Sequence, residues 1–232
     1  MKNTTQWIPT KILSTRNGYV INSDFVSKSS LIIATLQVES YIPLIKRHAK
    51  GGLLDCGCMK VPFYEVYHDI VSEIYCIDIT PNEHLDLVAD LNEPLPLESD
   101  SFDTILFTDV LQYITKPDQL FFEFSRLLRP GGKLILTIPF LYNIHDAPSD
   151  LQRFTEFALR KKCEEANMKV IELDIYGGLP DVFFDLLNKS KFSGPVFIKF
   201  FNWVRKTKKY QRLRELNDRK FPLGYNLVAE KI

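Results

Sequence analysis

The chain has 232 residues, of which 45% are hydrophobic and 25% are charged, a composition typical of one well-buried globular domain. Basic and acidic residues number 29 each, so the chain lacks the basic excess of a general nucleic-acid binder, and we expect no nucleic-acid partner. The opening stretch MKNTTQWIPTKIL lacks the apolar core of a signal peptide, and no run reaches the ~18 apolar residues of a membrane span. These features predict a cytoplasmic protein.

The N-terminal part of the chain precedes the regular pattern. Residues 1–25 mix aromatic and polar residues without a period and predict an irregular or hairpin extension. Residues 27–49 carry apolar residues at helical spacing and predict a helix, with Ser27 as its cap and Pro43 near its end.

Strands and helices then alternate. Strands are predicted at 53–56, 73–79, 87–91, 101–110, 133–140, 169–176 and 224–232, and helices at 62–71, 117–128 and 155–166. Nearly continuous apolar strands separated by helices indicate an α/β fold with a parallel sheet covered on both faces. We expect an N-terminal arm and helix at 1–49, a core at 50–176, a helical insertion or cap at 177–223, and the last strand of the core at 224–232.

Carboxylates follow the first three predicted strands, at Asp55, Asp78 and Asp90. In a doubly wound sheet, ligands bind at the carboxyl ends of the strands, so these residues should line one crevice. Asp78 lies 21 residues after Gly57, close to the ~20-residue offset of an acid that binds ribose hydroxyls.

The glycine turn after the first strand, LLDCGCMKVP, decides between cofactors. A dinucleotide needs further glycines for its pyrophosphate, but this loop has Met59 and Val61 there. S-adenosylmethionine (SAM) has no phosphate and needs only a tight turn, a ribose acid and a cleft for the base. The loop therefore favours SAM over a nicotinamide dinucleotide. The four cysteines lack the spacing of a zinc site and are interpreted as buried thiols, so no metal is expected.

The ordered set LLDCGC, CIDIT, VADLNEPLPLESDSFDTILFTDVLQYI and RLLRPGGKLILTIPF resembles the class I SAM-dependent methyltransferases, especially small ones with LDxGCGxxP loops. The similarity covers about residues 50–176 and the last strand. It implies a Rossmann-like, doubly wound, mostly parallel sheet of seven strands with an antiparallel last strand.

The resemblance also implies the cofactor site. Gly57 and its neighbours would contact the methionine moiety, Asp78 the ribose, and Asp90 with Leu91 the adenine. The whole expected set is Asp55, Gly57, Cys58, Met59, Asp78, Ile79, Asp90, Leu91 and Thr108. Two departures stand out: Met59 replaces the second glycine, and Gln112-Tyr113 replaces a common acid–histidine pair.

The loop FLYNIHDAPSDLQRFT follows the fifth predicted strand of the core and is the candidate for acceptor chemistry. His145 is the candidate base, because an imidazole titrates close to neutral pH, and Asp150 is its candidate support. Arg153 and Tyr113 are candidates for substrate contact. A bracing role for His145, and an ion pair between Arg153 and Asp146 or Asp150, are the alternatives.

Residues 195–214 stand apart in composition. PVFIKFFNWV is apolar and aromatic, and residues 199–214 contain seven basic residues and no acid, whereas the rest of the chain has 22 basic and 29 acidic residues. A helical cap over the acceptor pocket is one interpretation, and peripheral contact with a membrane surface is the other.

These features together predict methyl transfer from SAM to a small or glycan-like acceptor, at oxygen. Two alternatives remain open: a catalytically silent SAM-fold subunit that supports a partner, favoured by Met59 and Gln112, and a nicotinamide-dependent oxidoreductase. The oligomeric state does not follow from the sequence.

Overall fold

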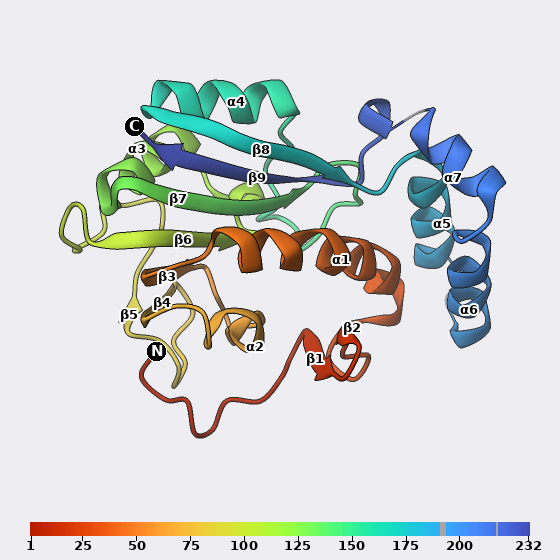
Figure 1. The fold of residues 1–232 in the computed structure, drawn as a ribbon, viewed down its shortest axis with the longest axis horizontal. Helices are drawn as coiled ribbons and strands as arrows, with labels where there is room; N and C mark the ends of the chain where they lie inside the picture. The colour runs from red at the N-terminus through yellow and green to blue at the C-terminus, as the bar shows by residue number, and fades with distance from the viewer. Residues whose placement is uncertain (191–193, 217) are drawn as a thin grey trace.

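The computed structural model describes residues 1–190, 194–216 and 218–232. In this part of the chain, seven strands form one sheet in the order β5-β4-β3-β6-β7-β9-β8 (Figure 1). They are β3 (Gly52–Cys56), β4 (Glu73–Asp78), β5 (Leu87–Val88), β6 (Phe102–Thr108), β7 (Leu128–Pro139), β8 (Met168–Tyr176) and β9 (Gly224–Lys231). The pairs from β5 to β7 are parallel, and β9 runs antiparallel to both β7 and β8. The predicted fold class and the antiparallel last strand are confirmed.

Helices cover both faces of the sheet. On one face α1 (Leu31–His48) and α2 (Tyr64–Tyr67) pack against Leu53 and Leu106. On the other face α3 (Pro117–Leu127) and α4 (Glu156–Glu165) pack against Leu54 and Phe107. Successive side chains of a strand point to opposite faces, so strands buried on both sides must be apolar at nearly every position. This explains the continuous apolar runs of the sequence.

Several element boundaries differ from the sequence prediction. The helix expected at 62–71 is only Tyr64–Tyr67, because the chain before it is used by a loop with two left-handed residues, Met59 and Val61. β7 begins at Leu128, because Leu128 pairs with Phe102, and a register shift in this pairing accommodates the extra residues before Lys133.

Caps also differ in part. Ser27 makes no side-chain cap bond, and a short 3₁₀ turn, η1 (Lys28–Ser30), precedes α1 instead. Thr155 caps α4 through the backbone N–H of Ala158, and Asn167 follows the helix in the left-handed region with a φ of 57°.

The N-terminal segment carries a two-stranded hairpin, β1 (Ile12–Thr15) and β2 (Gly18–Ile21), so the hairpin alternative for residues 1–25 is confirmed. The hairpin is tied to the core at Tyr19, whose hydroxyl donates to the carbonyl of Glu65. Ile12 is fully buried in the core on the α1 face.

A cap of helices lies at the end of the molecule where β8 leads into α5 (Figure 1). It contains α5 (Leu179–Lys189), α6 (Pro195–Val204), α7 (Lys208–Glu215) and the 3₁₀ turn η3 (Asp218–Lys220). Phe201 and Tyr210 pack with Ile32 and Leu36 at the start of α1, which fixes the cap to the core. The parallel strands point toward this same end, so the cap stands beside the crevice.

Candidate active site

The turn after β3 is closed tightly at Gly57. Its φ is 67°, and a Cβ placed on it would lie 2.5 Å from Cγ2 of Val110, so only glycine fits. The backbone N–H of Gly57 donates to the carbonyl of Ile77 at 2.8 Å. This packing brings the ends of β3, β4 and β6 together.

Met59 and Val61 follow the path that glycines would take, with φ of 45° and 54°. Such a conformation is unfavourable for a residue with a Cβ, and most of all for a β-branched one. The Met59 side chain is 69% exposed, whereas Val61 is fully buried in the core. The backbone at Met59 therefore keeps the conformation that a glycine would adopt, and the Met59 side chain points into solvent and not into the turn.

Asp78 lies at the end of β4 and is only 5% exposed. Its two carboxylate oxygens accept hydrogen bonds from the backbone N–H groups of Met59 and Thr80, each at 2.8 Å. A carboxylate has about four lone-pair sites, so each oxygen keeps capacity for a ribose hydroxyl. The two backbone donors fix its orientation.

Apolar side chains flank this carboxylate. Ile79 is 62% exposed directly after Asp78, and Leu91 is buried in the core beneath the neighbouring turn. Asp90 is exposed and accepts hydrogen bonds from the backbone and side chain of Asn92, both at 2.9 Å. Bare apolar surface beside a fixed carboxylate fits a nucleoside, so the residues at β3, β4 and β5 fit the adenosine part of SAM.

Three expected cofactor residues lie behind this surface. Asp55 is 2% exposed and accepts a hydrogen bond from the Tyr67 hydroxyl at 2.7 Å; burial raises the pKa of its carboxyl to about 7. Cys58 is buried, and Thr108 lies 3.2 Å from the Tyr41 hydroxyl through its Oγ1. In this structure they support the crevice from within.

A polar cluster at the end of β6 was not predicted from the sequence. Asp109 is contacted by Lys11 from the N-terminal segment and by Gln37 from α1. Gln37 is 3% exposed, although it sits in an otherwise apolar stretch of the helix. A polar amide among the inward-facing residues of α1 is the sequence signal that could have indicated it.

The loop after β7 brings three side chains together. Nδ1 of His145 lies 2.7 Å from Oδ2 of Asp146 and 2.9 Å from the hydroxyl of Tyr113. The Tyr113 hydroxyl also donates to Oδ2 of Asp146 at 3.1 Å. Burial raises the pKa of Tyr113 to about 12, and the charge of Asp146 acts in the same direction, so the phenol stays a donor.

The carboxylate of Asp150 is held by the backbone of its own loop and by Arg153, and its support of the His145 imidazole stays a prediction. Its carboxylate accepts the backbone N–H of His145 at 2.8 Å and is held by the guanidinium of Arg153. Hydrogen bonds from Arg153 lower the pKa of Asp150. The carboxyl group of Asp150 is 2% exposed, so this pair braces the base of the loop, and the acid beside the imidazole is Asp146. Arg153 makes the ion pair that was the alternative to substrate contact.

Backbone contacts hold the loop against the turn after β6, which contains η2 (Leu111–Tyr113). The N–H of Leu151 donates to the carbonyl of Gln112 at 3.0 Å, and the amide of Gln152 donates to the carbonyl of Ile114 at 2.6 Å. The side chain of Gln112 donates to the carbonyl of Asp109 at 2.7 Å. Gln112 thus connects the acceptor loop to the crevice.

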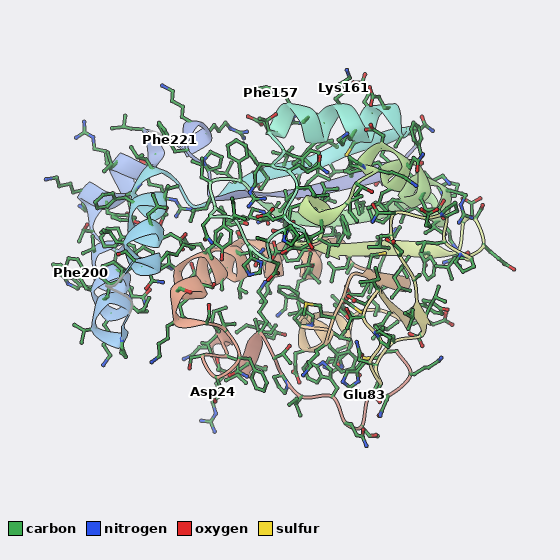
Figure 2. The ribbon with its side chains drawn as sticks, turned by 180° about the vertical axis from the view of Figure 1, so that it is seen from behind. Asp24, Glu83, Phe157, Lys161, Phe200 and Phe221 are labelled. Atoms are coloured by element: carbon green, nitrogen blue, oxygen red, sulfur yellow. The ribbon has the colours of Figure 1, made fainter. Side chains whose placement is uncertain are left out.

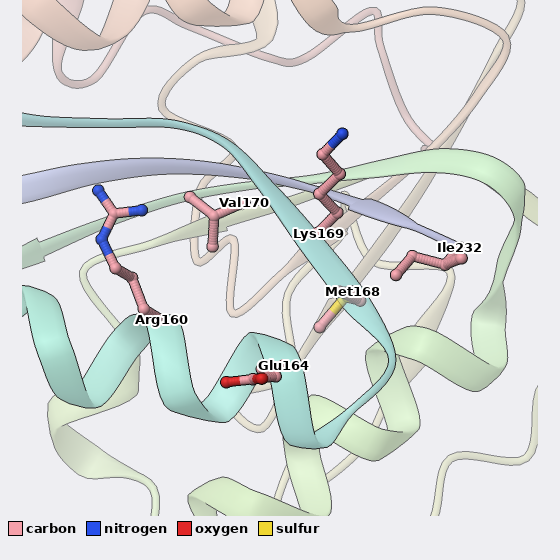
Figure 3. Close-up of a pocket in the computed structure, with 6 residues that line it drawn as sticks. All are labelled: Arg160, Glu164, Met168, Lys169, Val170 and Ile232. Carbon is pink, nitrogen blue, oxygen red and sulfur yellow. The ribbon is translucent and has the colours of Figure 1, made fainter.

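A hollow of about 370 Å³ lies elsewhere, between α4 and the β8–β9 edge of the sheet (Figure 3). It is lined by Arg160, Glu164, Met168, Lys169, Val170 and Ile232. Met168 begins β8 and Ile232 follows β9, so this hollow lies at the opposite end of the sheet from Asp78. None of the predicted site residues lines it.

In the described part of the chain, no helix is both long and apolar enough to cross a membrane.

Comparison with known proteins agrees with this geometry. Residues 54–136 match the family model of the methyltransferase domain. An uncharacterised protein of Methanocaldococcus jannaschii, MJ1123, is 29% identical over 106 residues, which are 43% of this chain and 51% of that protein. The chain therefore covers about half the length of this curated relative.

Solved structures share the fold. A SAM-dependent methyltransferase from Archaeoglobus fulgidus has a TM-score of 0.59 at 16% identity, covering 88% of this chain and 95% of its own. One from Mesorhizobium loti has a TM-score of 0.58 at 12% identity, covering 86% and 100%. The [4+2]-cyclase SpnF also shares the fold, with a TM-score of 0.54 at 19% identity, covering 86% of this chain and 81% of its own.

Because a cyclase shares this fold, the fold alone does not identify a methyltransferase. The segment that carries Gly57, Asp78 and Asp90 matches the methyltransferase domain, and the chain as a whole has the fold of SAM-dependent methyltransferases.

Proposed function

We propose that the protein is a SAM-dependent methyltransferase that methylates a hydroxyl group of a small or glycan-like acceptor, with His145 as the base. The observation that carries this proposal is the contact of the His145 imidazole with Asp146 and Tyr113. Oδ2 of Asp146 lies 2.7 Å from Nδ1, so the carboxylate would favour a proton on Nδ1, and that tautomer leaves the Nε2 lone pair for an incoming hydroxyl.

The chemistry supplied by SAM when bound is a methyl group on a sulfonium, which is open to in-line attack. A neutral hydroxyl is a weak nucleophile, so removal of its proton lowers the barrier, whereas a carboxylate acceptor needs no base. The imidazole is half-exposed and lies on a loop tied to the turn that carries Asp109. The turn after β6 and the loop after β7 are held together, and the positioning of the acceptor by them would supply much of the remaining rate enhancement.

Aromatic rings support a glycan-like acceptor. The ring of Tyr142 lies 6.1 Å from that of His145, and the hydroxyl of Tyr113 lies 2.9 Å from Nδ1 of the same imidazole. Lys189 of the cap lies 4.2 Å from the Tyr142 ring, so α5 reaches the same region. Flat apolar faces combined with a few polar groups suit a polyhydroxylated ring.

The direct test is to incubate the enzyme with SAM and a panel of mono- and oligosaccharides and to follow methylated products by mass spectrometry. Treatment of the product with mild alkali separates the acceptor types, because a methyl ether survives and a methyl ester is hydrolysed. An alkali-labile product would contradict the hydroxyl assignment. If no saccharide of the panel is methylated, whether or not SAM is consumed, the result would contradict the glycan proposal.

We also propose that the cap contacts an anionic membrane surface. On α6, Val196, Phe200 and Trp203 form one helical stripe, and their side chains are 81%, 49% and 66% exposed. Figure 2 shows Phe200 at the outer edge of the cap. Exposed lysines flank the stripe at Lys199, Lys206, Lys208 and Lys209, and residues 199–214 contain no acid. An apolar stripe with basic flanks complements a lipid surface with negative headgroups.

A further inference from the structure

Tyr142 connects the loop after β7 to the cap. It lies on the same loop as His145, and the centres of the two rings are 6.1 Å apart. Nζ of Lys189 on α5 lies 4.2 Å from the centre of the Tyr142 ring, and the Tyr142 hydroxyl lies 3.3 Å from Oγ of Ser30, just before α1. The Tyr142 side chain also packs against the apolar cluster that joins the cap to α1. The loop that carries the candidate base is therefore in direct contact with the cap.

The same cluster reaches α6. It contains Phe201 and is flanked by Phe197, and the ring of Phe184 on α5 lies 5.4 Å from that of Phe201 and 5.8 Å from that of Phe197. These contacts use the inner side of α6, whereas the stripe that includes Phe200 and Trp203 stays exposed. The exposed stripe and the loop after β7 thus belong to one packed unit.

A second group of exposed apolar side chains lies on that loop. Ile144 directly precedes His145 and is 74% exposed, and Leu151 is 52% exposed. Single exposed apolar residues are common on protein surfaces, but apolar side chains that gather on one part of a molecule mark a contact surface. Here they lie on two elements that pack together, the loop after β7 and the cap.

Charge indicates what this surface meets. Residues 199–214 contain seven basic residues and no acid, and four exposed lysines flank the stripe. Apolar side chains with basic flanks complement a lipid surface with negative headgroups. A protein with an acidic rim is the competing occupant, and it would leave these side chains in water when lipid is the only addition.

We propose that the acceptor is itself a membrane amphiphile, whose hydroxylated head reaches His145 while its hydrocarbon chain stays in the lipid that the cap contacts. This inference rests on the proposed hydroxyl methylation and deepens it, because it assigns the acceptor to the class of lipid-anchored polyols. In the transfer, the head-group oxygen forms a bond to the methyl carbon as the bond from that carbon to the sulfur of SAM breaks, and the hydroxyl proton passes to the imidazole. The hydrocarbon chain serves only to hold the acceptor on the same surface as the protein.

Site-specific labelling tests where the loop lies when the protein is on a vesicle. The four native cysteines are buried, so a thiol-reactive nitrobenzoxadiazole dye can be attached to one introduced cysteine at a time. The positions are Ile144→Cys on the loop, Phe200→Cys on the cap and Lys161→Cys on α4, where Figure 2 shows Lys161 away from Phe200. The vesicles contain phosphatidylserine, phosphatidylcholine and a phosphatidylcholine with a doxyl quencher on its chain. The dyes at 144 and 200 should shift their emission to the blue and be quenched, and the dye at 161 should do neither.

Each other pattern has a definite meaning. Quenching at 200 without quenching at 144 would overturn the inference and leave the membrane contact of the cap in place. No quenching at 200 would contradict the membrane contact on which the inference rests. Equal quenching at all three positions would indicate adsorption without a preferred orientation, and it would overturn the inference as well.

Transfer to matched acceptors tests the substrate class. Each saccharide of the panel is offered with SAM in two forms, as the free methyl glycoside and as the diacylglycerol glycoside in vesicles that contain phosphatidylserine. At equal total concentration, the lipid-linked form should be methylated at least about tenfold faster, because protein and acceptor meet on one surface at a raised effective concentration. Equal or faster transfer to the free glycosides would overturn this inference alone. Transfer to neither form would contradict the proposed glycan methylation and, with it, this inference.

Discussion

The hydroxyl of Tyr113 lies 2.9 Å from Nδ1 of His145, although 32 residues separate them in the chain. Tyr113 follows β6 and His145 follows β7, and these strands are parallel neighbours whose ends meet at one edge of the sheet. Asp146 contacts both side chains through Oδ2. A small hydrogen-bonded network therefore joins the turn after β6 to the loop after β7.

Replacement of the imidazole tests its role as base. His145→Ala should lower turnover by ~10²–10⁴-fold, because a base adds that much to proton removal in the transition state. SAM affinity should barely change, since the loop lies on the acceptor side. Turnover is measured at saturating SAM, and the affinity by calorimetry. A variant that keeps more than about a tenth of the native rate rules out the base role.

The two acids of the loop should behave differently. Asp146→Asn should lower turnover by less than His145→Ala does, and the two losses should not add, because Asp146 acts through the imidazole. Asp150→Asn should instead lower the thermal midpoint of unfolding, since Asp150 holds Arg153 and the backbone of the loop. Turnover and thermal unfolding are compared for both variants. A loss of turnover in Asp150→Asn without a loss of stability, together with a native rate in Asp146→Asn, would indicate that Asp150 and not Asp146 supports the imidazole.

Asp78 is expected to bind ribose. Asp78→Ala should weaken SAM binding by on the order of 1.5–3 kcal/mol, through the loss of hydrogen bonds to a charged group. Glu83→Ala is the matched control, because Glu83 is an exposed acid on the following loop (Figure 2). Calorimetry measures both. An Asp78→Ala protein that is folded and binds SAM within twofold of the native value would contradict the ribose assignment.

Met59 occupies a glycine-like conformation with its side chain in solvent. Met59→Gly should therefore leave SAM binding equal or tighter, with unfolding free energy changed by no more than about 1 kcal/mol, since relieved strain offsets the added freedom of the unfolded chain. Met59→Leu keeps a side chain there and serves as control. Weaker binding in Met59→Gly alone would show that the thioether packs on the ligand.

The buried carboxyl of Asp55 should make stability depend on pH. Its pKa is raised by burial to about 7, so between about pH 4 and 7 the folded protein holds a proton that the unfolded chain has lost. The contribution of this group to the unfolding free energy is therefore fully present below pH 4 and falls as pH rises to about 7. Asp55→Asn should remove this dependence and raise the thermal midpoint relative to the native protein above pH 7. Thermal unfolding of both proteins is recorded without SAM from pH 4 to 8. If the thermal midpoints of the native protein and of Asp55→Asn change with pH in parallel, the assignment to Asp55 is contradicted.

The cap surface should bind vesicles that contain phosphatidylserine more than vesicles of phosphatidylcholine alone. Trp203→Ser should reduce the bound fraction by loss of apolar burial, and Lys208→Glu with Lys209→Glu should reduce it by charge repulsion. Phe157→Ser and Lys161→Glu are controls on α4, away from α6 and α7 (Figure 2). Co-sedimentation measures binding. Equal binding to both vesicle types, or equal losses in the α4 controls, would contradict a specific lipid surface.

The sequence determined the layered fold and the places of Gly57 and Asp78 at the ends of its strands. Continuous apolar strands separated by helices require a parallel sheet, and the turn at Gly57 and the acid at Asp78 lie at fixed places after their own strands. These are local features, because each residue follows the strand that positions it by a single step along the chain. The positions of Gly57 and Asp78 relative to the predicted strands therefore place them at the carboxyl edge of the sheet before any tertiary contact is known.

Only the tertiary structure decided which side chains meet across strands. Lys11 and Asp109 are 98 residues apart, and Gln37 is 72 residues from Asp109; they meet because the N-terminal segment and α1 pack over the end of β6. Likewise, Asp146 and Asp150 differ by only four positions, and the direction of the loop after β7 turns one toward the imidazole and the other toward Arg153. Such contacts depend on strand order and loop direction, which no local pattern of residues contains.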